Sequence, residues 1–244
     1  MNNDDTTFIV GGAGFVGTRL KAFFDKMSKK YVIGDIENSS EKIIKLDIED
    51  IDTLDHLAGS DCIINLAAVH RDDIRPLSRY DDVNVQGSAN VCEAARKHGI
   101  NKIVFTSSVA IYGFAPADTD ETGEPNYFND YGRTKYLAEQ VYKEWQAEDP
   151  ENRTLVIVRP TVIFGEGNRG NVYNLLKQIA SGRFVMFGNG KNRKSMAYVE
   201  NVVAFIEYSL SFKPGLHIYN YIDKPDFDMN TLISGTRKTL FGKT

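Results

Sequence analysis

The stretch Thr6-Thr-Phe-Ile-Val-Gly-Gly-Ala-Gly-Phe-Val-Gly17 decides the fold predicted for this chain. Its first residues form a short β-prone run, and the residues from Thr18 to Met27 have the apolar spacing of a helix. The glycines between them, at every third position, allow a tight turn, let the backbone approach a pyrophosphate and let the helix pack closely on the strand. Because the amino end of a helix attracts an anion, this strand, loop and helix predict a dinucleotide-binding site.

Asp35 follows the next strand-like run, from Tyr31 to Ile33. A dinucleotide-binding fold places an acidic residue here to accept hydrogen bonds from the adenosine ribose hydroxyls. The 2′-phosphate of NADP would meet this carboxylate, and no arginine or lysine adjoins it. The sequence therefore predicts NAD as the cofactor.

Strands and helices continue to alternate along the first two thirds of the chain. Further strand-like runs cover Ile43 to Leu46, Asp61 to Ala68 and Lys102 to Thr106, and a helix is predicted between Arg79 and His98, closed by Gly99. Connections of this length favour a parallel sheet with helices on both faces. We therefore expect a Rossmann-type, doubly wound α/β fold.

The segment Tyr131-Gly-Arg-Thr-Lys135 is the strongest candidate for chemistry. A tyrosine and a lysine at this spacing lie on the same face of a helix. A positive charge close to a phenol favours the phenolate and would lower the tyrosine pKa from about 10 towards the range of a general base. The ordinary alternative is an exposed tyrosine beside a solvated lysine.

Two serines, Ser107 and Ser108, follow the predicted strand that ends at Thr106. Ligands in sheets of this kind bind beyond the carboxyl ends of the strands, so either hydroxyl could contact a substrate. A serine at the end of a strand can also serve only as a cap or a turn residue. Their position between a glycine loop and the tyrosine-lysine pair favours a functional role.

Composition excludes several classes of protein. With 244 residues, 42% apolar and 25% charged, the chain is typical of a globular protein. A net charge of -4 provides no basic field for nucleic acid. The acidic amino terminus and the lack of a long apolar run predict a cytoplasmic chain without a signal or a membrane span. Cys62 and Cys92 are expected to be reduced packing residues, and no metal site is expected.

These motifs together resemble the extended short-chain dehydrogenase/reductase family, and in particular its branch of sugar epimerases and dehydratases. The resemblance covers almost the whole chain. Besides the glycine loop and Asp35, it rests on Asp47-Ile48, Asn65-Leu-Ala-Ala68, Val83-Asn84-Val85 with Gly87, Ser107-Ser108 ahead of Ile111-Tyr112-Gly113, Tyr131 with Lys135, and Arg159-Pro160.

The resemblance implies a role for each of these residues. Lys135 would contact the nicotinamide ribose, Tyr131 would be the acid and base, and Ser108 would hydrogen-bond the reacting oxygen, with Ser107 as the adjacent alternative. The residues that it implies for binding NAD are Gly11, Gly14, Phe15, Val16, Gly17, Asp35, Ile36, Asp47, Ile48, Leu66, Ala67, Ala68, Asn84, Ser107, Tyr131, Lys135, Pro160 and Ile163.

The resemblance also narrows the reaction. Dehydratases of this branch typically carry an Asp-Glu pair after the serine or threonine, where this chain has Val109-Ala110. A 4,6-dehydratase is therefore disfavoured. The segments His70 to Asp73, Arg159 to Tyr173 and Lys194 to Tyr198 look most like epimerases that act at C4 of an N-acetylhexosamine linked through diphosphate to a polyprenyl lipid.

The residues expected to bind the substrate, besides Ser108, are Asn168, Arg169, Arg193 and Lys194. The broad family commonly has Arg-Asp-Phe where this chain has Lys194-Ser-Met, so Lys194 or Arg193 would replace the usual arginine on the diphosphate. Arg169 and the run from Lys191 to Lys194 suit a diphosphate, although such a run is ordinarily a solvated face. His70 could approach the cofactor or substrate, but a lone histidine is more often a hydrogen-bonded loop residue.

The function predicted is NAD-dependent 4-epimerisation of a diphosphate-linked sugar, on a nucleotide or polyprenyl carrier, through a transient 4-keto sugar in surface polysaccharide biosynthesis. Oxidation at C4 makes this carbon planar, and reduction from the opposite face inverts it. A 4-ketosugar reductase would carry the same motifs and consume reduced cofactor. A non-catalytic dinucleotide sensor on the same fold is a further alternative, which the presence of Ser108, Tyr131 and Lys135 disfavours.

The chain from residue 161 onward predicts smaller elements. They are a helix from Val172 to Ala180, a strand from Phe184 to Phe187, a helix from Val199 to Leu210, a strand from Leu216 to Tyr221 and a last helix through Leu232, Ile233 and Leu240. We expect residues 1-160 to form the NAD-binding domain and residues 161-244 an interleaved substrate lobe. Relatives usually continue further, so this lobe is expected to be incomplete. An apolar surface left uncovered there would favour a homodimer, and a lipid-linked substrate would bring the chain to a membrane surface.

Overall fold

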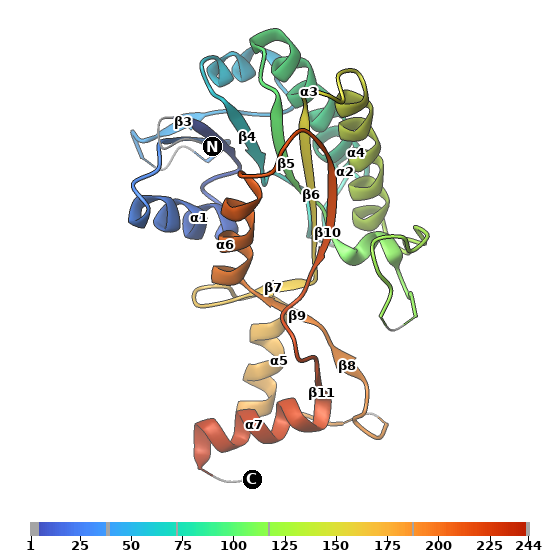
Figure 1. Ribbon diagram of the computed structural model, residues 1–244. Coiled ribbons are helices and arrows are strands. Elements are labelled where there is room, and N and C mark those ends of the chain that lie inside the picture. The colour runs from blue at the N-terminus through green and yellow to red at the C-terminus, as the bar shows by residue number, and fades with distance from the viewer. Residues whose placement is uncertain (1–4, 38–39, 72, 117, 187, 243–244) are drawn as a thin grey trace.

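A seven-stranded parallel sheet forms the centre of the protein (Figure 1). The computed structural model describes residues 5–37, 40–71, 73–116, 118–186 and 188–242. The strands of the sheet are β1 (Thr7–Val10), β2 (Tyr31–Asp35), β3 (Ile43–Lys45), β4 (Cys62–Asn65), β5 (Lys102–Thr106), β6 (Thr154–Pro160) and β10 (Gly215–Tyr221). This architecture confirms the predicted Rossmann-type fold.

Helices and short strands make up the rest of the structure. The helices are α1 (Phe15–Lys26), α2 (Ser78–Tyr80), α3 (Gly87–His98), α4 (Asp130–Ala147), α5 (Asn171–Ala180), α6 (Val199–Ser209) and α7 (Met229–Phe241). Shorter helical segments are η1 (Ile51–Leu57), η2 (Asp81–Gln86), which is a π-helix, and η3 (Val109–Tyr112). The short strands are β7 (Val162–Phe164), β8 (Arg193–Lys194), β9 (Met196–Tyr198) and β11 (Phe227–Asp228).

The order of the strands, β10-β6-β5-β4-β1-β2-β3, places a switch point between β1 and β4. From β1 the chain moves outward to β2 and β3, and it then returns to the other side of β1 with β4. In open α/β sheets a ligand binds in the crevice beyond the carboxyl ends of the strands at such a point. The sheet topology therefore predicts a ligand site at the loops that follow Val10 and Asn65.

The sheet is buried on both faces, and its residues alternate between two cores. Phe8, Ile63 and Phe105 face the core that contains α3 and α4. Ile9 and Ile64, one position along the same strands, face the core that contains α1 and α6. Side chains alternate across a strand, so this division follows from the backbone alone. It explains why the strands are nearly continuous apolar runs.

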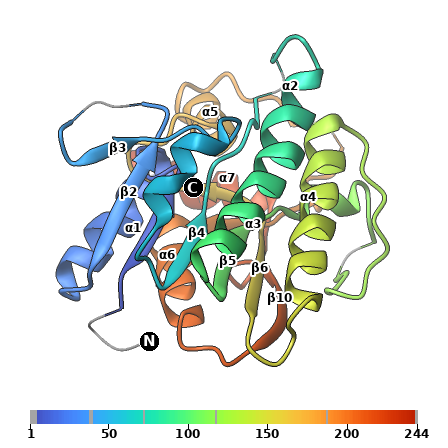
Figure 2. The same cartoon turned by 90° about the horizontal axis from the view of Figure 1, so that it is seen from above.

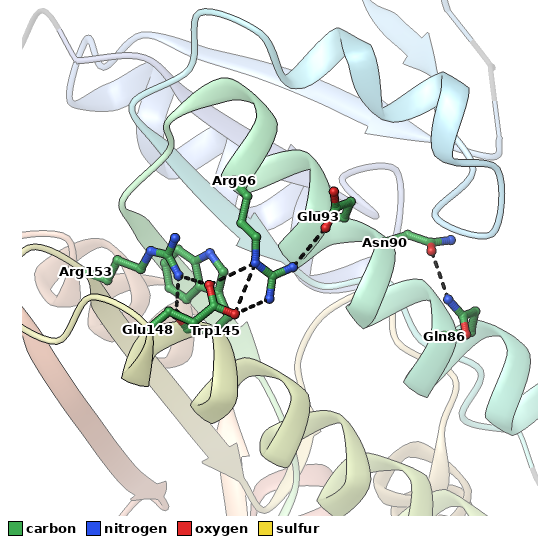
Figure 3. Close-up of polar contacts among 7 residues, drawn as sticks. All are labelled: Gln86, Asn90, Glu93, Arg96, Trp145, Glu148 and Arg153. Atoms are coloured by element: carbon green, nitrogen blue, oxygen red, sulfur yellow. Dashed lines mark hydrogen bonds and ion pairs between the residues drawn. The ribbon is translucent and has the colours of Figure 1, made fainter.

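Helices α3 and α4 lie side by side on one face of the sheet, and α1 and α6 lie together on the other (Figure 2). Arg96 of α3 donates two hydrogen bonds to Glu148 at the carboxyl end of α4, and Arg153 donates to the same carboxylate (Figure 3). Arg153 also lies over the ring of Trp145, 4.8 Å from its centroid. These contacts fasten the ends of the two helices to each other.

A small lobe projects beyond the carboxyl ends of the strands (Figure 1). It consists of α5, α7 and the antiparallel pair of β8 and β11, around a small apolar cluster that includes Ile179, Met229 and Ile233. The other elements predicted after residue 160 join the sheet instead. Helix α6 packs on α1, and β10 pairs with β6 from Gly215 to Tyr221. The prediction that all of these elements form the lobe is therefore wrong for α6 and β10.

Two further predictions differ from the structure. No strand forms over residues 184–186, because Phe184 and Met186 pack on the cluster of α5 and α7 rather than along another strand; Phe187 lies outside the described residues. The helix predicted from Arg79 to His98 contains the π-helical segment η2 before α3 begins. Such segments often occur at functional sites.

Across the part of the chain that the structure describes, no helix is both long and apolar enough to cross a bilayer.

Candidate active site

The loop between β1 and α1 requires its glycines for close packing. Gly11 has a positive φ of 74°, and a Cβ atom there would come within 2.7 Å of the Ala67 backbone nitrogen. A Cβ atom on Gly17 would lie 2.5 Å from the Gly12 Cα atom. The loop after β1 therefore touches the loop after β4 without intervening side chains. This places two backbone segments together at the switch point of the sheet.

The amino end of α1 is open to an anion. Gly14 occupies the cap position, no side chain caps the helix, and its first turn contains no acidic residue. The first amides of a helix have no partners within the helix and carry partial positive charge. Phe15, Val16 and Gly17 provide these amides. A pyrophosphate therefore fits the donors that this loop presents.

Asp35 lies at the carboxyl end of β2, beside the glycine loop. One carboxylate oxygen accepts a hydrogen bond from the Ala13 amide at 2.8 Å, and the other accepts from the Glu37 amide at 3.0 Å. A carboxylate has about four acceptor positions, so capacity remains for ribose hydroxyls. The neighbouring Ile36 side chain is 64% exposed. The position of Asp35 is the one that the sequence predicts for a ribose acceptor.

The loop after β4 is held in place by two asparagines. Asn65 accepts a hydrogen bond from the Ala67 amide at 3.0 Å. The side chain of Asn84, in η2, accepts from the Val69 amide at 2.8 Å and donates to the Val69 carbonyl at 3.0 Å and to Thr134 at 3.0 Å. Asn84 thus joins this loop to α4. Its side chain positions the backbone of the predicted cofactor site, rather than presenting its own polar atoms to it.

The other predicted cofactor residues lie on several elements near the carboxyl edge of the sheet. Asp47 accepts a hydrogen bond from the Glu49 amide at 3.0 Å, and Ile48 is buried against α3, where it would meet a Cβ atom on Gly87 at 2.6 Å. Leu66 and Ala68 belong to the loop after β4, while Pro160 ends β6 and Ile163 lies in β7. Ile48 therefore acts through packing on α3.

The two serines have different environments. The hydroxyl of Ser107 is buried and donates to Glu139 at 2.5 Å. The hydroxyl of Ser108 accepts a hydrogen bond from the Ala110 amide at 3.1 Å, and it lies close enough to the Tyr131 side chain to lower the pKa of that phenol. Ser108 is therefore the serine that lies next to the tyrosine. The sequence left this choice open.

Lys135 does not contact the Tyr131 phenol in the way that the sequence suggests. Its ammonium group donates to the Thr106 carbonyl at 2.8 Å and lies over the Phe105 ring. Burial lowers the pKa of Lys135 to about 7, while the charge of Glu139 raises it. Burial also raises the pKa of Tyr131, and the neighbouring Ser108 hydroxyl lowers it. The prediction that Lys135 lowers the tyrosine pKa is therefore wrong for this arrangement, because Lys135 is directed to Thr106.

A buried ion pair, which the sequence reasoning missed, lies behind the serines. Arg159 of β6 donates to both carboxylate oxygens of Glu139, at 2.9 and 2.6 Å. Arg159 also donates to the hydroxyl of Tyr112 at 2.5 Å, and that hydroxyl donates to Asn220 of β10 at 2.9 Å. Glu139 follows Lys135 by one turn of α4, and this spacing was the available signal.

Polar groups without partners lie at the ends of two strands. Among the described residues, the buried hydroxyls of Thr106 and Thr161 have no hydrogen-bond partner. Thr106 is the last residue of β5, beside Lys135, and Thr161 follows Pro160 at the end of β6. Buried hydroxyls are normally satisfied, so these two atoms suit an additional polar group. Together with the open end of α1 and the acceptor Asp35, they make the carboxyl edge of the sheet a good fit for a dinucleotide.

The predicted substrate residues other than Ser108 lie in two separate segments, the loop before α5 and strand β8. Asn168 and Arg169 lie in the loop before α5, where the Asn168 side chain accepts from the Gly170 amide and Arg169 is exposed. Arg193 and Lys194 form β8 in the lobe. His70 is exposed, and its Nδ1 lies 3.5 Å from the Ala68 carbonyl oxygen, an ordinary loop contact. The structure places β8 and α5 in the same lobe, beyond the strand ends (Figure 1).

Comparison with known proteins identifies the family. The model of the NAD dependent epimerase/dehydratase family matches residues 7–221. The chain belongs to this family. A 4-epimerase from Escherichia coli O157:H7, whose substrate is named as N-acetyl-alpha-D-glucosaminyl-diphospho-ditrans,octacis-undecaprenol, is 48% identical over 97% of this chain and 73% of its own length. UDP-glucose 4-epimerase 2 from Oryza sativa subsp. japonica is 30% identical over 73% of this chain, which spans only 52% of that protein.

Solved structures share the fold of this family member. MoeE5, in complex with UDP-glucuronic acid and NAD, superimposes with a TM-score of 0.85 at 23% identity and covers 97% of this chain and 82% of its own. UDP-N-acetylglucosamine 4-epimerase from Bacillus cereus gives a TM-score of 0.86 at 16% identity, over 98% of this chain and 83% of its own. The family assignment confirms NAD as the cofactor and confirms the resemblance to sugar epimerases.

We expect this family member to bind NADH more tightly than NADPH, by about 10-fold or more, because a 2′-phosphate would meet the Asp35 carboxylate and like charges in contact repel. Fluorescence titration of the purified protein with each reduced cofactor measures the difference. The variant Asp35→Asn should bring the two dissociation constants closer together. Equal affinities in the unmodified protein would show that Asp35 does not select the cofactor.

Proposed function

We propose that this protein catalyses the NAD-dependent 4-epimerisation of an N-acetylhexosamine linked through diphosphate to a polyprenyl lipid. The observation that carries this proposal is the 48% identity, over 97% of the chain, to the Escherichia coli O157:H7 enzyme of that description. The juxtaposition of Ser108 with Tyr131, and the position of Lys135 on the following turn of α4, support catalysis rather than cofactor binding alone.

We assign four parts of the chain to holding the cofactor. The amides at the start of α1 would bind the pyrophosphate, and Asp35 would accept hydrogen bonds from the adenosine ribose. Lys135 of α4 and Thr106, the last residue of β5, would hold the nicotinamide ribose. When bound, NAD would supply the acceptor and donor of hydride at C4 of the sugar.

Tyr131 and Ser108 would handle the proton of the sugar C4 hydroxyl. Burial favours the neutral phenol of Tyr131, and the neighbouring Ser108 hydroxyl opposes this by lowering its pKa. The phenolate form of Tyr131 would take the proton when the C4 oxygen becomes a carbonyl, and the resulting phenol would return it when the alcohol forms again. Ser108 would hold the same oxygen through both steps.

The substrate would bind between the sheet and the lobe. We assign residues 1-160 to cofactor binding and residues 161-244 to an interleaved substrate part that supplies Asn168, Arg169, Arg193 and Lys194 for the diphosphate. Glu166 helps to position the loop that carries Asn168 and Arg169, because its backbone carbonyl accepts a hydrogen bond from Arg19 of α1. A lipid-linked substrate would bring the protein to the cytoplasmic surface of a membrane. For the assembly of the protein, we propose a homodimer.

Parallel assays on two carriers test the proposal. The purified protein, with NAD and no added NADH, is incubated with polyprenyl-diphospho-N-acetylglucosamine and, separately, with UDP-N-acetylglucosamine. We expect conversion to the C4 epimer on the lipid carrier, with little on the nucleotide carrier. Faster conversion of UDP-N-acetylglucosamine would show that the carrier is a nucleotide and not a polyprenyl lipid. Stoichiometric consumption of NADH with a 4-keto sugar, without epimerisation, would identify a reductase instead.

A further inference from the structure

Glu139 is an unusual residue for a helix, because its side chain has no exposed surface and bears a charge. It lies on α4, one turn after Lys135, and its side chain is 0% exposed. Buried carboxylates are rare unless they are paired. Here the ion pair with Arg159 provides the pairing, and Lys143 lies 3.7 Å away on the following turn. A pairing role alone would not require contact with Ser107.

The carboxylate also reaches the serine turn. Its Oε1 atom accepts the hydrogen bond from Ser107 at 2.5 Å, in addition to the one from Arg159. Ser107 is further fixed by its amide, which donates to the Val158 carbonyl at 2.7 Å. The next residue is Ser108, the partner of Tyr131. A single buried carboxylate therefore connects the helix that carries the tyrosine to the turn that carries the serine.

We propose that Glu139 is a positioning residue of this active site: its carboxylate holds the turn of Ser107 and Ser108 against α4, and its negative charge, one helical turn from Lys135, acts on that lysine. The inference rests on the proposed function only for its activity measurement. Its physical basis is that a small displacement of a group that contacts the reacting atom lowers the rate strongly.

The second part of the proposal concerns the charge of Lys135. Glu139 lies one turn after Lys135 on α4, and it is itself paired with Arg159 of β6 and Lys143 of α4. Strand β5 offers Lys135 only a carbonyl and an aromatic ring. Glu139 is the carboxylate that favours the charged form of Lys135, against the effect of burial. Removing its charge should therefore make Lys135 lose its proton at a lower pH.

Two variants separate the two parts of the proposal. Glu139→Gln keeps the shape of the side chain and removes its charge. Ser107→Ala keeps the ion pair and removes only the hydrogen bond to the serine turn. Glu144→Gln is the matched control, because Glu144 is exposed on the same helix. Lysine labelled with ¹³C at Cε reports ionisation of Lys135 by NMR, and the Lys135→Arg variant assigns the signal.

We expect the titration midpoint of Lys135 to fall by about one pH unit in Glu139→Gln and to stay unchanged in Glu144→Gln and Ser107→Ala. Because the Ser107 hydroxyl is buried and donates to Glu139 rather than being available to the cofactor, we expect Ser107→Ala to lower kcat about 10-fold without changing the dissociation constant for NAD. An unchanged midpoint in Glu139→Gln would overturn the electrostatic part. Normal turnover by Ser107→Ala would overturn the positioning part, and this variant decides it if Glu139→Gln does not fold. Absence of epimerase activity in the unmodified protein would refute the proposed function and leave the titration result standing.

Discussion

Tyr131→Phe is expected to lower sugar turnover by about 100-fold or more, because the substitution removes the oxygen that would transfer the C4 hydroxyl proton. The ring remains to fill its partly buried position beside the Ser108 turn, so the fold and the affinity for NAD should be retained. Rates of epimerisation at saturating substrate, together with a fluorescence titration of NADH, measure the two quantities separately. The loss should appear in kcat, since proton transfer belongs to the transition state.

Tyr136→Phe is the control for this experiment. Tyr136 lies on the same helix, with its ring 6.2 Å from that of Tyr127, and it has no place in the proposed chemistry. Its loss of the hydroxyl should change kcat by less than about twofold. If Tyr131→Phe retained near-normal turnover while binding NADH, Tyr131 would not be the acid and base, and another group would have to move the proton.

Arg159→Leu is expected to reduce the free energy of unfolding by about 3 to 5 kcal/mol, because it leaves the carboxylate of Glu139 buried without its main partner. The Arg159 side chain is 4% exposed and that of Glu139 is 0% exposed. The remaining cation, Lys143, lies at 3.7 Å and contributes a weaker contact. Unfolding by urea, followed by circular dichroism, measures the change.

Arg96→Leu provides the comparison, since Arg96 makes an equally short bidentate contact at the surface (Figure 3). The Arg96 and Glu148 side chains are 35% and 43% exposed, so water compensates for the loss of the pair. We expect a cost of about 1 kcal/mol or less. Equal costs for the two variants would mean that burial does not determine the value of the Arg159 pair.

The sheet was predictable from the sequence because its strands are short apolar runs separated by helices of regular spacing. The glycine loop after Val10 and the acid at Asp35 also appear where local sequence places them. The division of residues after 160 was not predictable. Helix α6 and β10 carry apolar faces that could have packed on either the lobe or the sheet, and only the pairing of β10 with β6 decides between these.

The directions of polar side chains were the least predictable part of the site. Ser107 and Ser108 are adjacent and chemically identical, yet Glu139 takes the first and Tyr131 the second. Lys135 has the predicted helical spacing from Tyr131, but a carbonyl at the end of β5 competes for its ammonium group. The hydrogen-bond partner of each of these side chains is set by residues distant in the sequence. Spacing within one helix does not reveal those residues.

The fate of the hydrogen at C4 tests the proposed epimerisation most directly. Polyprenyl-diphospho-N-acetylglucosamine with deuterium at C4 is converted in ordinary water, with NAD and without added NADH, and the epimer is examined by mass spectrometry and NMR. Hydride removal and return within one active site predict that the product keeps its deuterium at C4. Replacement of the deuterium by hydrogen from water, or conversion only with stoichiometric NADH, would contradict the proposed reaction.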